Sequence, residues 1–236
     1  MQQLFQEVIT TKTDEGNVFF ANGKPLRTKK GKILRAPNEE IAAEIVREWK
    51  SQKVKVAIET MPFTHILNTK IDRVASGRNA VIAGLLKYID TDLICYYAPG
   101  PQELVMLQRQ RWDPFRLWFS QHFACELKTT DSLQAQLQPE KAKQAVFEKM
   151  GKMNDDILTL LLWVASLGGS LVMALAFVQQ AFGTEQILHS RFVDEDYRTS
   201  LLNAAGIQED HQEFILTKGR VRKDLEASSK YLLSIL

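Results

Sequence analysis

The sequence VFFANGKPLRT, residues 18–28, predicts a β-hairpin from which the rest of the fold can be worked out. Val18 to Ala21 is rich in β-forming side chains, and Asn22-Gly23 is the dipeptide that best fits the tight turn of a two-residue hairpin. Leu26 to Thr28 is then the returning strand. Because a hairpin of this kind pairs antiparallel strands, the N-terminal part is expected to contain an antiparallel sheet.

The flanking segments extend this sheet and add one helix. Phe5 to Ile9 predicts a preceding strand, and Ile33 to Arg35 predicts a further one. Asn38 is a favoured helix cap, and the apolar residues from Ile41 to Trp49 recur at helical spacing. Lys53 to Thr60 alternates between polar and apolar residues, which predicts a half-buried strand.

After Met61 the apolar spacing becomes helical. Leu93 to Tyr97 is the one later segment with strand-like residues, although a helix is equally compatible with it. Pro114 follows Asp113, a pair that predicts a helix start with Asp113 as the cap. Further helices are expected over residues 63–75, 79–88, 101 onward, 139–150, 157–178, 184–204 and 208 to the C-terminus. The sequence therefore predicts an α+β fold, with a small N-terminal antiparallel sheet domain and one helix over residues 1–62 and a larger all-helical C-terminal domain over residues 63–236.

One uncharged segment is long enough to span a bilayer. It runs from Ile157 to Val178, ILTLLLWVASLGGSLVMALAFV. Gly168-Gly169 interrupts it near the middle, and glycine lowers helix stability by about 1 kcal/mol relative to alanine. Asp155-Asp156 and the glutamines after Val178 offer no Lys/Arg bias that would orient a span. We therefore expect a kinked core helix, or two helices that meet at the glycines, and no stable membrane insertion.

The sequence shows no recognisable catalytic apparatus. Lys24 precedes a proline, so Gly23-Lys24 does not fit a phosphate-binding loop. The four histidines and two cysteines lack the spacing of a metal site. His122 and Cys125 could form a nucleophile couple, but a packed pair is far commoner. We therefore expect no catalytic residue, no cofactor and no metal.

Charge is nearly balanced, with 30 Lys+Arg against 28 Asp+Glu, so no overall field favours nucleic acid. Basic side chains gather in the hairpin region, where they could hold phosphates or could protect a sheet edge from aggregation. That basic group comprises Lys24, Arg27, Lys29, Lys30, Lys32 and Arg35. Acidic residues gather at Asp194-Glu195-Asp196 and at Glu209-Asp210, where a surface that binds a protein partner is the simplest interpretation.

Several short strings, in order, resemble one family, the ATP-twelve family of assembly chaperones for the F-type ATP synthase. The strings are Asn22-Gly23-Lys24-Pro25-Leu26-Arg27-Thr28, Pro37 with Ala42-Ala43, Glu48-Trp49-Lys50-Ser51-Gln52, Met61-Pro62-Phe63-Thr64 with Asp72, Tyr88 with Thr91-Asp92 to Tyr96, Gln108, and Trp112-Asp113-Pro114. The second half matches more loosely, through Gly168-Gly169 and Ser190-Arg191 before Val193 to Tyr197. Ala205-Gly206 stands where the family usually has Trp-Gly.

The resemblance implies an ATP-independent chaperone, not an enzyme, that binds the unassembled α subunit and prevents its aggregation until the β subunit replaces it. It implies partner contacts among Asp194, Glu195, Asp196, Glu209, Trp112 and Asp113, with Asp194 as the first choice for the functional acid and Glu195 or Glu209 as alternatives. It also implies structural roles for Gly23, Pro25, Arg27, Trp49, Pro62 and Asp92.

Two other functions stay open at this point: a nucleic-acid-binding module that uses the basic hairpin, and a hydrolase of unrecognised type. The free chain is expected to be a monomer. The start of the chain has no presequence-like segment, so a bacterial cytoplasmic location is expected, or the mitochondrial matrix if the chain is eukaryotic and trimmed.

Overall fold

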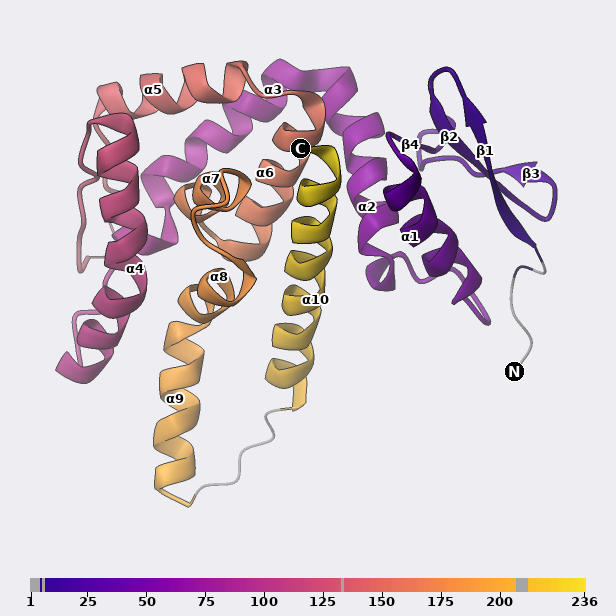
Figure 1. The fold of residues 1–236 in the computed structure, drawn as a ribbon. Coiled ribbons are helices and arrows are strands. Elements are labelled where there is room, and N and C mark those ends of the chain that lie inside the picture. Colours follow the sequence, from indigo (N-terminus) through magenta and orange to yellow (C-terminus); the bar gives the residue numbers. More distant parts are fainter. Residues whose placement is uncertain (1–4, 6, 133, 207–211) are drawn as a thin grey trace. The chain divides into compact units, whose positions relative to one another are not determined.

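The computed structural model describes residues 1–236 except 1–4, 6, 133 and 207–211 (Figure 1). In the described residues a small antiparallel sheet with one helix comes first and helices follow, as the sequence predicts. The strands are β1 (Val8–Thr13), β2 (Gly16–Ala21), β3 (Lys24–Pro25) and β4 (Arg35–Ala36). The helices are α1 (Glu39–Lys50), α2 (Pro62–Thr69), α3 (Ala75–Leu86), α4 (Gln102–Phe123), α5 (Glu140–Gly151), α6 (Asp155–Gly168), α7 (Leu171–Val178), α8 (Thr184–Arg191), α9 (Val193–Ala204) and α10 (Gln212–Ile235).

The contacts divide the chain into two compact units. The first comprises residues 1–81, 154–160 and 226–236, and the second comprises residues 82–153 and 161–225. The first unit therefore includes the start of α6 and the end of α10 beside the N-terminal elements. These are groups of contacting residues, and the domain boundary expected after residue 62 stays a prediction.

The hairpin turn forms where the sequence places it, but the returning strand is Lys24–Pro25 and not Leu26 to Thr28. Phe20 pairs with Pro25 and Ala21 with Lys24, so Asn22-Gly23 makes the two-residue turn. Asn22 has φ +48° and Gly23 has φ +76°, the left-handed conformation that such a turn requires. The expected strand over Phe5 to Ile9 lies later, at Val8–Thr13, because it pairs with β2 through a second tight turn that joins Thr13 to Gly16.

Helix α1 packs on the sheet and closes the core of the first unit. The Asn38 side chain accepts a hydrogen bond from the backbone amide of Ile41 at 2.9 Å, which confirms Asn38 as the cap. Phe19, Ile41 and Ile45 have at most 1% of their surface exposed. The helix therefore buries its apolar face against β1, β2 and β4.

The strand expected over Lys53 to Thr60 is wrong. Residues 53–57 are irregular, and Ile58–Thr60 forms a single 3₁₀ turn. Val54 and Val56 are 74% and 40% exposed. Alternation alone does not make a strand, because a strand also needs a neighbour that pairs with its backbone.

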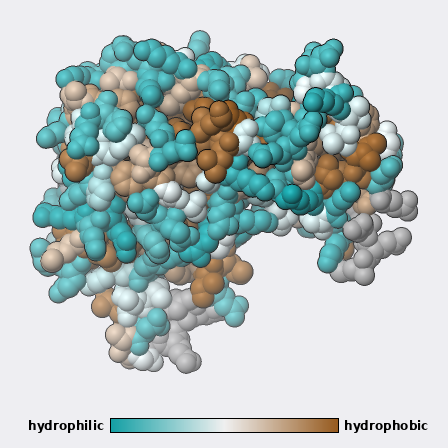
Figure 2. Space-filling model, in the orientation of Figure 1, coloured by the Kyte–Doolittle hydropathy of each residue, from teal (hydrophilic) through white to brown (hydrophobic). Residues whose placement is uncertain are grey.

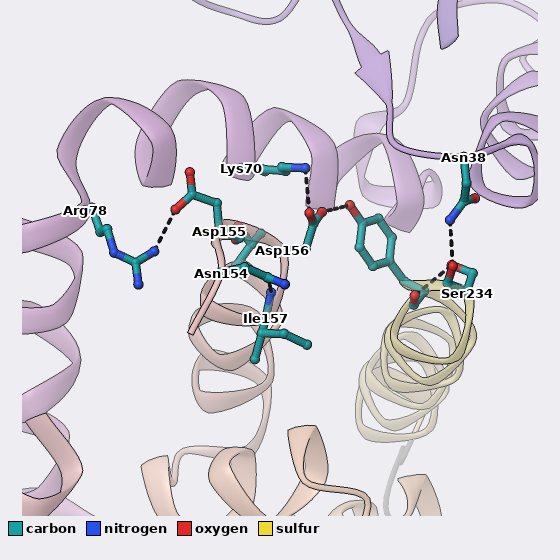
Figure 3. A network of polar contacts seen from close by, with 10 residues as sticks. Asn38, Lys70, Arg78, Asn154, Asp155, Asp156, Ile157 and Ser234 are labelled. Atoms are coloured by element: carbon teal, nitrogen blue, oxygen red, sulfur yellow. Dashed lines mark hydrogen bonds and ion pairs between the residues drawn. The ribbon is translucent and has the colours of Figure 1, made fainter. Parts of the chain in front are cut away.

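A network of polar contacts joins the start of α6 and the end of α10 to α1, α3 and the α2–α3 junction within the first unit (Figure 3). Lys70 and Arg78 each pair at 2.7 Å with an acid in the first turn of α6, Asp156 and Asp155 respectively. The Tyr231 hydroxyl also donates to Asp156. These contacts explain why segments distant in the sequence belong to one unit.

The second unit has α7 at its centre. All eight residues of α7 are buried, and α7 packs against α4. Gly169, with φ +68°, separates α6 from α7, and the Ser170 hydroxyl caps α7 by accepting from the Met173 amide at 3.0 Å. This confirms the prediction of two core helices that meet at the glycines. Among the described residues, no helix is both long and apolar enough to cross a membrane.

Two further helix predictions are corrected by the structure. Pro114 lies inside α4 and does not begin a new helix, so Asp113 is not a cap. Trp112 and Phe115, on the two sides of the proline, are both buried, and this packing favours a helix that continues through Pro114. The helix expected over residues 184–204 ends at Arg191 and restarts at Val193, since Phe192 has a non-helical backbone (ψ +21°).

Candidate partner-binding site

The predicted partner contacts of the second unit lie on two helices that touch each other, α4 and α9. Gln108, one helical turn before Trp112, is 1% exposed. Its side-chain amide donates to the Asp194 carboxylate at 2.7 Å, and its carbonyl oxygen accepts from the Ala98 amide at 2.8 Å. A buried glutamine therefore holds Asp194 through a neutral hydrogen bond.

Trp112 fastens α4 to α8 and is not available at the surface. It is 1% exposed, and its indole N–H donates to the Ser190 carbonyl oxygen at 2.9 Å. The Ser190 hydroxyl returns a hydrogen bond to the Arg111 carbonyl at 3.1 Å. Trp112 thus acts in the structure as a packing residue that fixes the helix before α9.

The three consecutive acids at the start of α9 differ in their neighbours. Glu195 lies 3.5 Å from Arg191, and Asp196 pairs with Lys218 at 2.6 Å. Asp194 is exposed, and among the described residues no basic group lies within ion-pair distance of it. The positive end of the α9 dipole stabilises a carboxylate at this position. Of these three acids, Asp194 is therefore the one whose carboxylate is available to form an ion pair with a partner.

Asp113 belongs to a separate polar cluster on α4. It accepts from the Tyr97 hydroxyl and, at 3.0 Å, from Arg116. Burial and the Asp113 carboxylate raise the pKa of Tyr97 to about 12. The Arg116 guanidinium also donates to the Tyr97 oxygen at 3.2 Å. Asp113 is half exposed but already paired, so a partner would have to compete with Arg116 for it.

Glu209, the alternative functional acid, lies outside the described residues, as does Asp210. The structure therefore brings Gln108 and Asp194 together, places Trp112 beneath them and leaves Asp113 in its own cluster. Gln108 stands out in the sequence only as part of a family string. Its hydrogen bond to Asp194 joins residues 86 positions apart in the sequence, and no local sequence pattern predicts such a contact.

The expected structural positions lie where turns, caps and packing require them. Gly23 makes the hairpin turn, Pro25 lies in β3, and Arg27 donates to the Gly31 carbonyl at 2.7 Å. Pro62 is the first residue of α2. Trp49 donates its indole N–H to the Thr64 hydroxyl at 3.1 Å, and its ring lies 5.3 Å from that of Phe5.

Asp92 has no exposed surface and fixes the start of α7. Its carboxylate accepts from the Val172 amide at 3.0 Å and, more weakly, from the Ile94 amide at 3.4 Å. Burial raises the pKa of Asp92 from 3.8 to about 6, against the opposing effect of these hydrogen bonds. The residue is thus a buried cap for the central helix.

The basic hairpin is largely occupied by contacts within the chain. Lys30 donates to the Asp72 backbone carbonyl at 2.8 Å, Lys32 donates to the Ile71 carbonyl at 3.1 Å, and Arg35 pairs with Glu15. Asp72 is itself buried and accepts from the Thr28 hydroxyl at 2.6 Å. A surface that binds nucleic acid needs its basic groups free for phosphates, so this arrangement disfavours that function.

The His122–Cys125 pair is not assembled as a nucleophile couple. The His122 ring stacks on Trp118 at 4.5 Å, and its Nδ1 lies 2.9 Å from the Trp118 carbonyl oxygen. The Cys125 sulfur lies 3.7 Å from the Glu126 carbonyl oxygen. A cavity of about 250 Å³ on the same helix is lined by Asp113, Arg116, Leu117, Ser120, Glu126 and Leu127, and neither of the two residues lines it. Among the described residues, no group of acids, histidines or cysteines is arranged to hold a metal ion.

Comparison with known proteins adds a family and three solved structures. A family model described as ATP12 chaperone protein matches residues 2–120. The crystal structure of Atp12 from Paracoccus denitrificans superposes with a TM-score of 0.80 at 25% identity, over 98% of this chain and 97% of that one. An aspartate-to-lysine mutant of the Paracoccus protein superposes with a TM-score of 0.79 at 24% identity, over 98% of this chain and 96% of that one. A candidate chaperone from Agrobacterium tumefaciens superposes with a TM-score of 0.83 at 29% identity, over 99% of this chain and 85% of that one.

Proposed function

The chain belongs to the ATP12 chaperone family, and from that premise we propose that its client is the unassembled α subunit of the F-type ATP synthase. The chain binds the α subunit, prevents it from aggregating, and releases it when the β subunit binds the same surface of the α subunit. The free chain acts as a monomer, without ATP, cofactor or catalysis.

The observation that carries this proposal is the environment of Asp194. An exposed carboxylate is held by a buried glutamine, and no basic group of the described residues lies within ion-pair distance of it, whereas Glu195 and Asp196 are each paired. The Asp194 carboxylate is already exposed to solvent, and a partner that supplies a Lys or Arg side chain can form a charge-assisted hydrogen bond with it. The position is therefore suited to recognition of a partner.

The mode of action follows from what a holding chaperone needs. A subunit that lacks its neighbours exposes apolar surface and aggregates through it. A chaperone that covers this surface with modest affinity can be displaced by the correct neighbour through competition alone. The proposal includes a bacterial cytoplasmic location, in keeping with the bacterial sources of the similar structures; a eukaryotic member would act in the mitochondrial matrix.

The test is to co-express the α subunit with the unmodified chain or with a variant and to measure soluble α subunit and the complex by size-exclusion chromatography. The unmodified chain should increase soluble α subunit and co-elute with it. Asp194→Lys should lose most of this effect, whereas Asp194→Asn should keep part of it because the hydrogen bond from Gln108 survives.

Glu209→Lys, measured in parallel, tests the alternative acid. If the unmodified chain fails to solubilise the α subunit, the proposed client is wrong. If Asp194→Lys works as well as the unmodified chain while Glu209→Lys does not, the client stands and the assignment of the acid moves to Glu209.

A further inference from the structure

Gln108 is a buried side chain whose amide is hydrogen-bonded at both ends. It is 1% exposed, on α4. Its carbonyl oxygen accepts from the Ala98 amide at 2.8 Å, and its nitrogen donates to Asp194 Oδ1 at 2.7 Å. A buried polar side chain is costly unless it is hydrogen-bonded, so a glutamine here depends on both partners. Gln108 therefore joins the backbone before α4 to the first turn of α9.

The bond to Ala98 determines which end of the Gln108 amide faces Asp194. A backbone N–H is only a donor, so it must meet the amide oxygen. The nitrogen is then directed at α9, where it needs an acceptor. An ionised carboxylate is acceptor-only and meets this need with one oxygen. The reversed amide would set oxygen against oxygen and N–H against N–H, so the observed orientation is the favourable one.

Gln108 orients Asp194 without offsetting its charge. The two following acids are held by cations, Glu195 by Arg191 at 3.5 Å and Asp196 by Lys218 at 2.6 Å. A neutral amide leaves the negative charge of Asp194 in place. Within the described part of the chain, Asp194 Oδ2 has no hydrogen-bond partner, and no basic side chain pairs with this acid.

The surface on the α4 side of the second unit is mainly polar. Figure 2 shows hydrophilic residues over most of it, at the left of the view, with apolar side chains scattered among them. On a polar surface, recognition depends on where individual charges and hydrogen-bonding groups lie. A carboxylate held in one position therefore offers a partner a defined point of contact.

We infer that Gln108 is a positioning residue for client binding, which holds Asp194 through Oδ1 and so presents Oδ2, still charged, to a lysine or arginine of the client. The inference rests on the proposed function and adds to it the buried residue through which Asp194 acts. Holding the carboxylate in place beforehand strengthens binding, because the client does not have to order it. Gln108 itself lies below the surface and does not touch the client.

The most informative variant is Gln108→Glu, because its effect should depend on pH. A protonated carboxyl offers the same groups as the amide, an oxygen that accepts from Ala98 and an O–H that donates to Asp194. Once ionised, it sets a second negative charge against Asp194. Burial and the Asp194 charge both raise the pKa of the introduced carboxyl above the value of about 4.3 that it has in an unfolded chain. The variant should therefore resemble the unmodified chain at low pH and lose the arrangement as pH rises.

The test measures affinity for purified α subunit at pH 5, 6.5 and 8. Gln108→Leu, which has no donor at any pH, should bind about 10-fold more weakly than the unmodified chain throughout, the scale of one hydrogen bond to a charged group. Gln108→Glu should bind within about 2-fold of the unmodified chain at pH 5 and at least about 10-fold more weakly at pH 8.

Other charged groups around α4 are the same in all these proteins, so they cancel in the ratios. Helix α7 carries no charge, and α5 meets the far end of α4, where Lys141 donates to the Ala124 carbonyl. The charged side chains of α8 and α9, which pack against α4, are Glu185, His189, Arg191, Asp194, Glu195, Asp196 and Arg198.

Two further measurements separate positioning from a general effect on folding. In an Asp194→Ala background, Gln108→Leu should weaken binding no further, because the residue through which Gln108 acts is absent. Without client, the melting temperature of Gln108→Glu relative to the unmodified chain should fall from pH 5 to pH 8. A carboxyl whose pKa is raised in the folded state stabilises the fold less as pH rises.

The outcomes separate this inference from the proposed function. If the unmodified chain does not bind the α subunit, the client is wrong and the positioning role falls with it. If the unmodified chain binds and Gln108→Leu binds equally well, the client stands and the inference is overturned. Binding of Gln108→Glu that keeps a constant ratio to the unmodified chain from pH 5 to pH 8 would overturn it too. Should Gln108→Leu fail to fold, the measurements on Gln108→Glu decide alone.

Discussion

Replacing the buried carboxyl Asp92 by asparagine should change how the stability of the protein depends on pH. Asp92 has no exposed surface, and its oxygens accept backbone hydrogen bonds at the start of α7. Burial raises its pKa from 3.8 to about 6, so the folded protein keeps a proton there that the unfolded chain has already released. Asparagine has a similar shape and cannot ionise.

The direction and size of the effect follow from these two pKa values. Between about pH 4 and pH 6 the folded state binds more protons than the unfolded state, so the free energy of unfolding falls as pH rises through this window. A difference of about two pKa units corresponds to about 3 kcal/mol. The protonated Asp92 carboxyl stabilises the fold fully below about pH 4, and this contribution is lost by about pH 6. Above about pH 6 the contribution of Asp92 no longer changes with pH. In Asp92→Asn the free energy of unfolding should not show this fall, because asparagine does not ionise.

The assay is urea unfolding of the unmodified chain and the variant at pH 4, 5, 6 and 7, with the free energy of unfolding compared at each pH. The pKa of Asp224 is likewise raised to about 6 by burial, but Asp224 is present in both proteins and cancels in the difference. The stability of the unmodified chain relative to Asp92→Asn should fall by about 3 kcal/mol from pH 4 to pH 7. Asp131→Asn, at an exposed aspartate, is the control. A flat difference, or one that rises with pH, would show that the backbone hydrogen bonds outweigh burial and would refute the reasoning.

Three other substitutions probe contacts that hold the units in shape. Asp72→Ala removes the acceptor of the buried Thr28 hydroxyl and should lower the free energy of unfolding by about 1–3 kcal/mol in urea titrations; no change would mean that water replaces the carboxylate. Glu48→Ala removes the carboxylate that accepts the first free amides of α2 at 2.7 and 2.8 Å, and should cost about 1–2 kcal/mol by the same measurement. Trp112→Phe leaves the Ser190 carbonyl without its donor and should lower the melting temperature without weakening the α-subunit complex; weaker binding at unchanged stability would assign Trp112 to the interface instead.

The sequence was most informative where a structure is determined by neighbouring residues. The Asn22-Gly23 turn, the Asn38 cap and the break at Gly168-Gly169 were all predictable, because a turn, a cap or a glycine acts over a few positions. The strand expected over residues 53–60 failed for the opposite reason. Alternation there was clear, but whether a backbone finds a pairing neighbour depends on the whole sheet.

The candidate site was predictable only in part. The acids at 194–196 were visible as a cluster, yet they differ through residues far away in sequence: Gln108 beside Asp194 and Lys218 beside Asp196. The exposure of Leu201 and Ile215, which is 52% and 64%, was not predictable either, because in the sequence both look like ordinary core residues of amphipathic helices.

Pro114 shows the same limit on a smaller scale. A proline after an aspartate predicts a helix start, since proline lacks the amide that an interior position requires. The buried aromatic residues around it on α4 offset that loss, and the helix continues. Local preference was overridden by packing that the sequence does not display.

The central claim is that the chain holds the α subunit until the β subunit replaces it. The most direct measurement is light scattering by purified α subunit diluted from denaturant, with and without an equimolar amount of this chain, followed by addition of β subunit. The account predicts that the chain suppresses scattering without ATP, and that the β subunit then releases the chain as a free monomer and forms an α–β complex. Scattering that is unchanged by the chain, or a complex with the chain that the β subunit cannot dissociate, would contradict it.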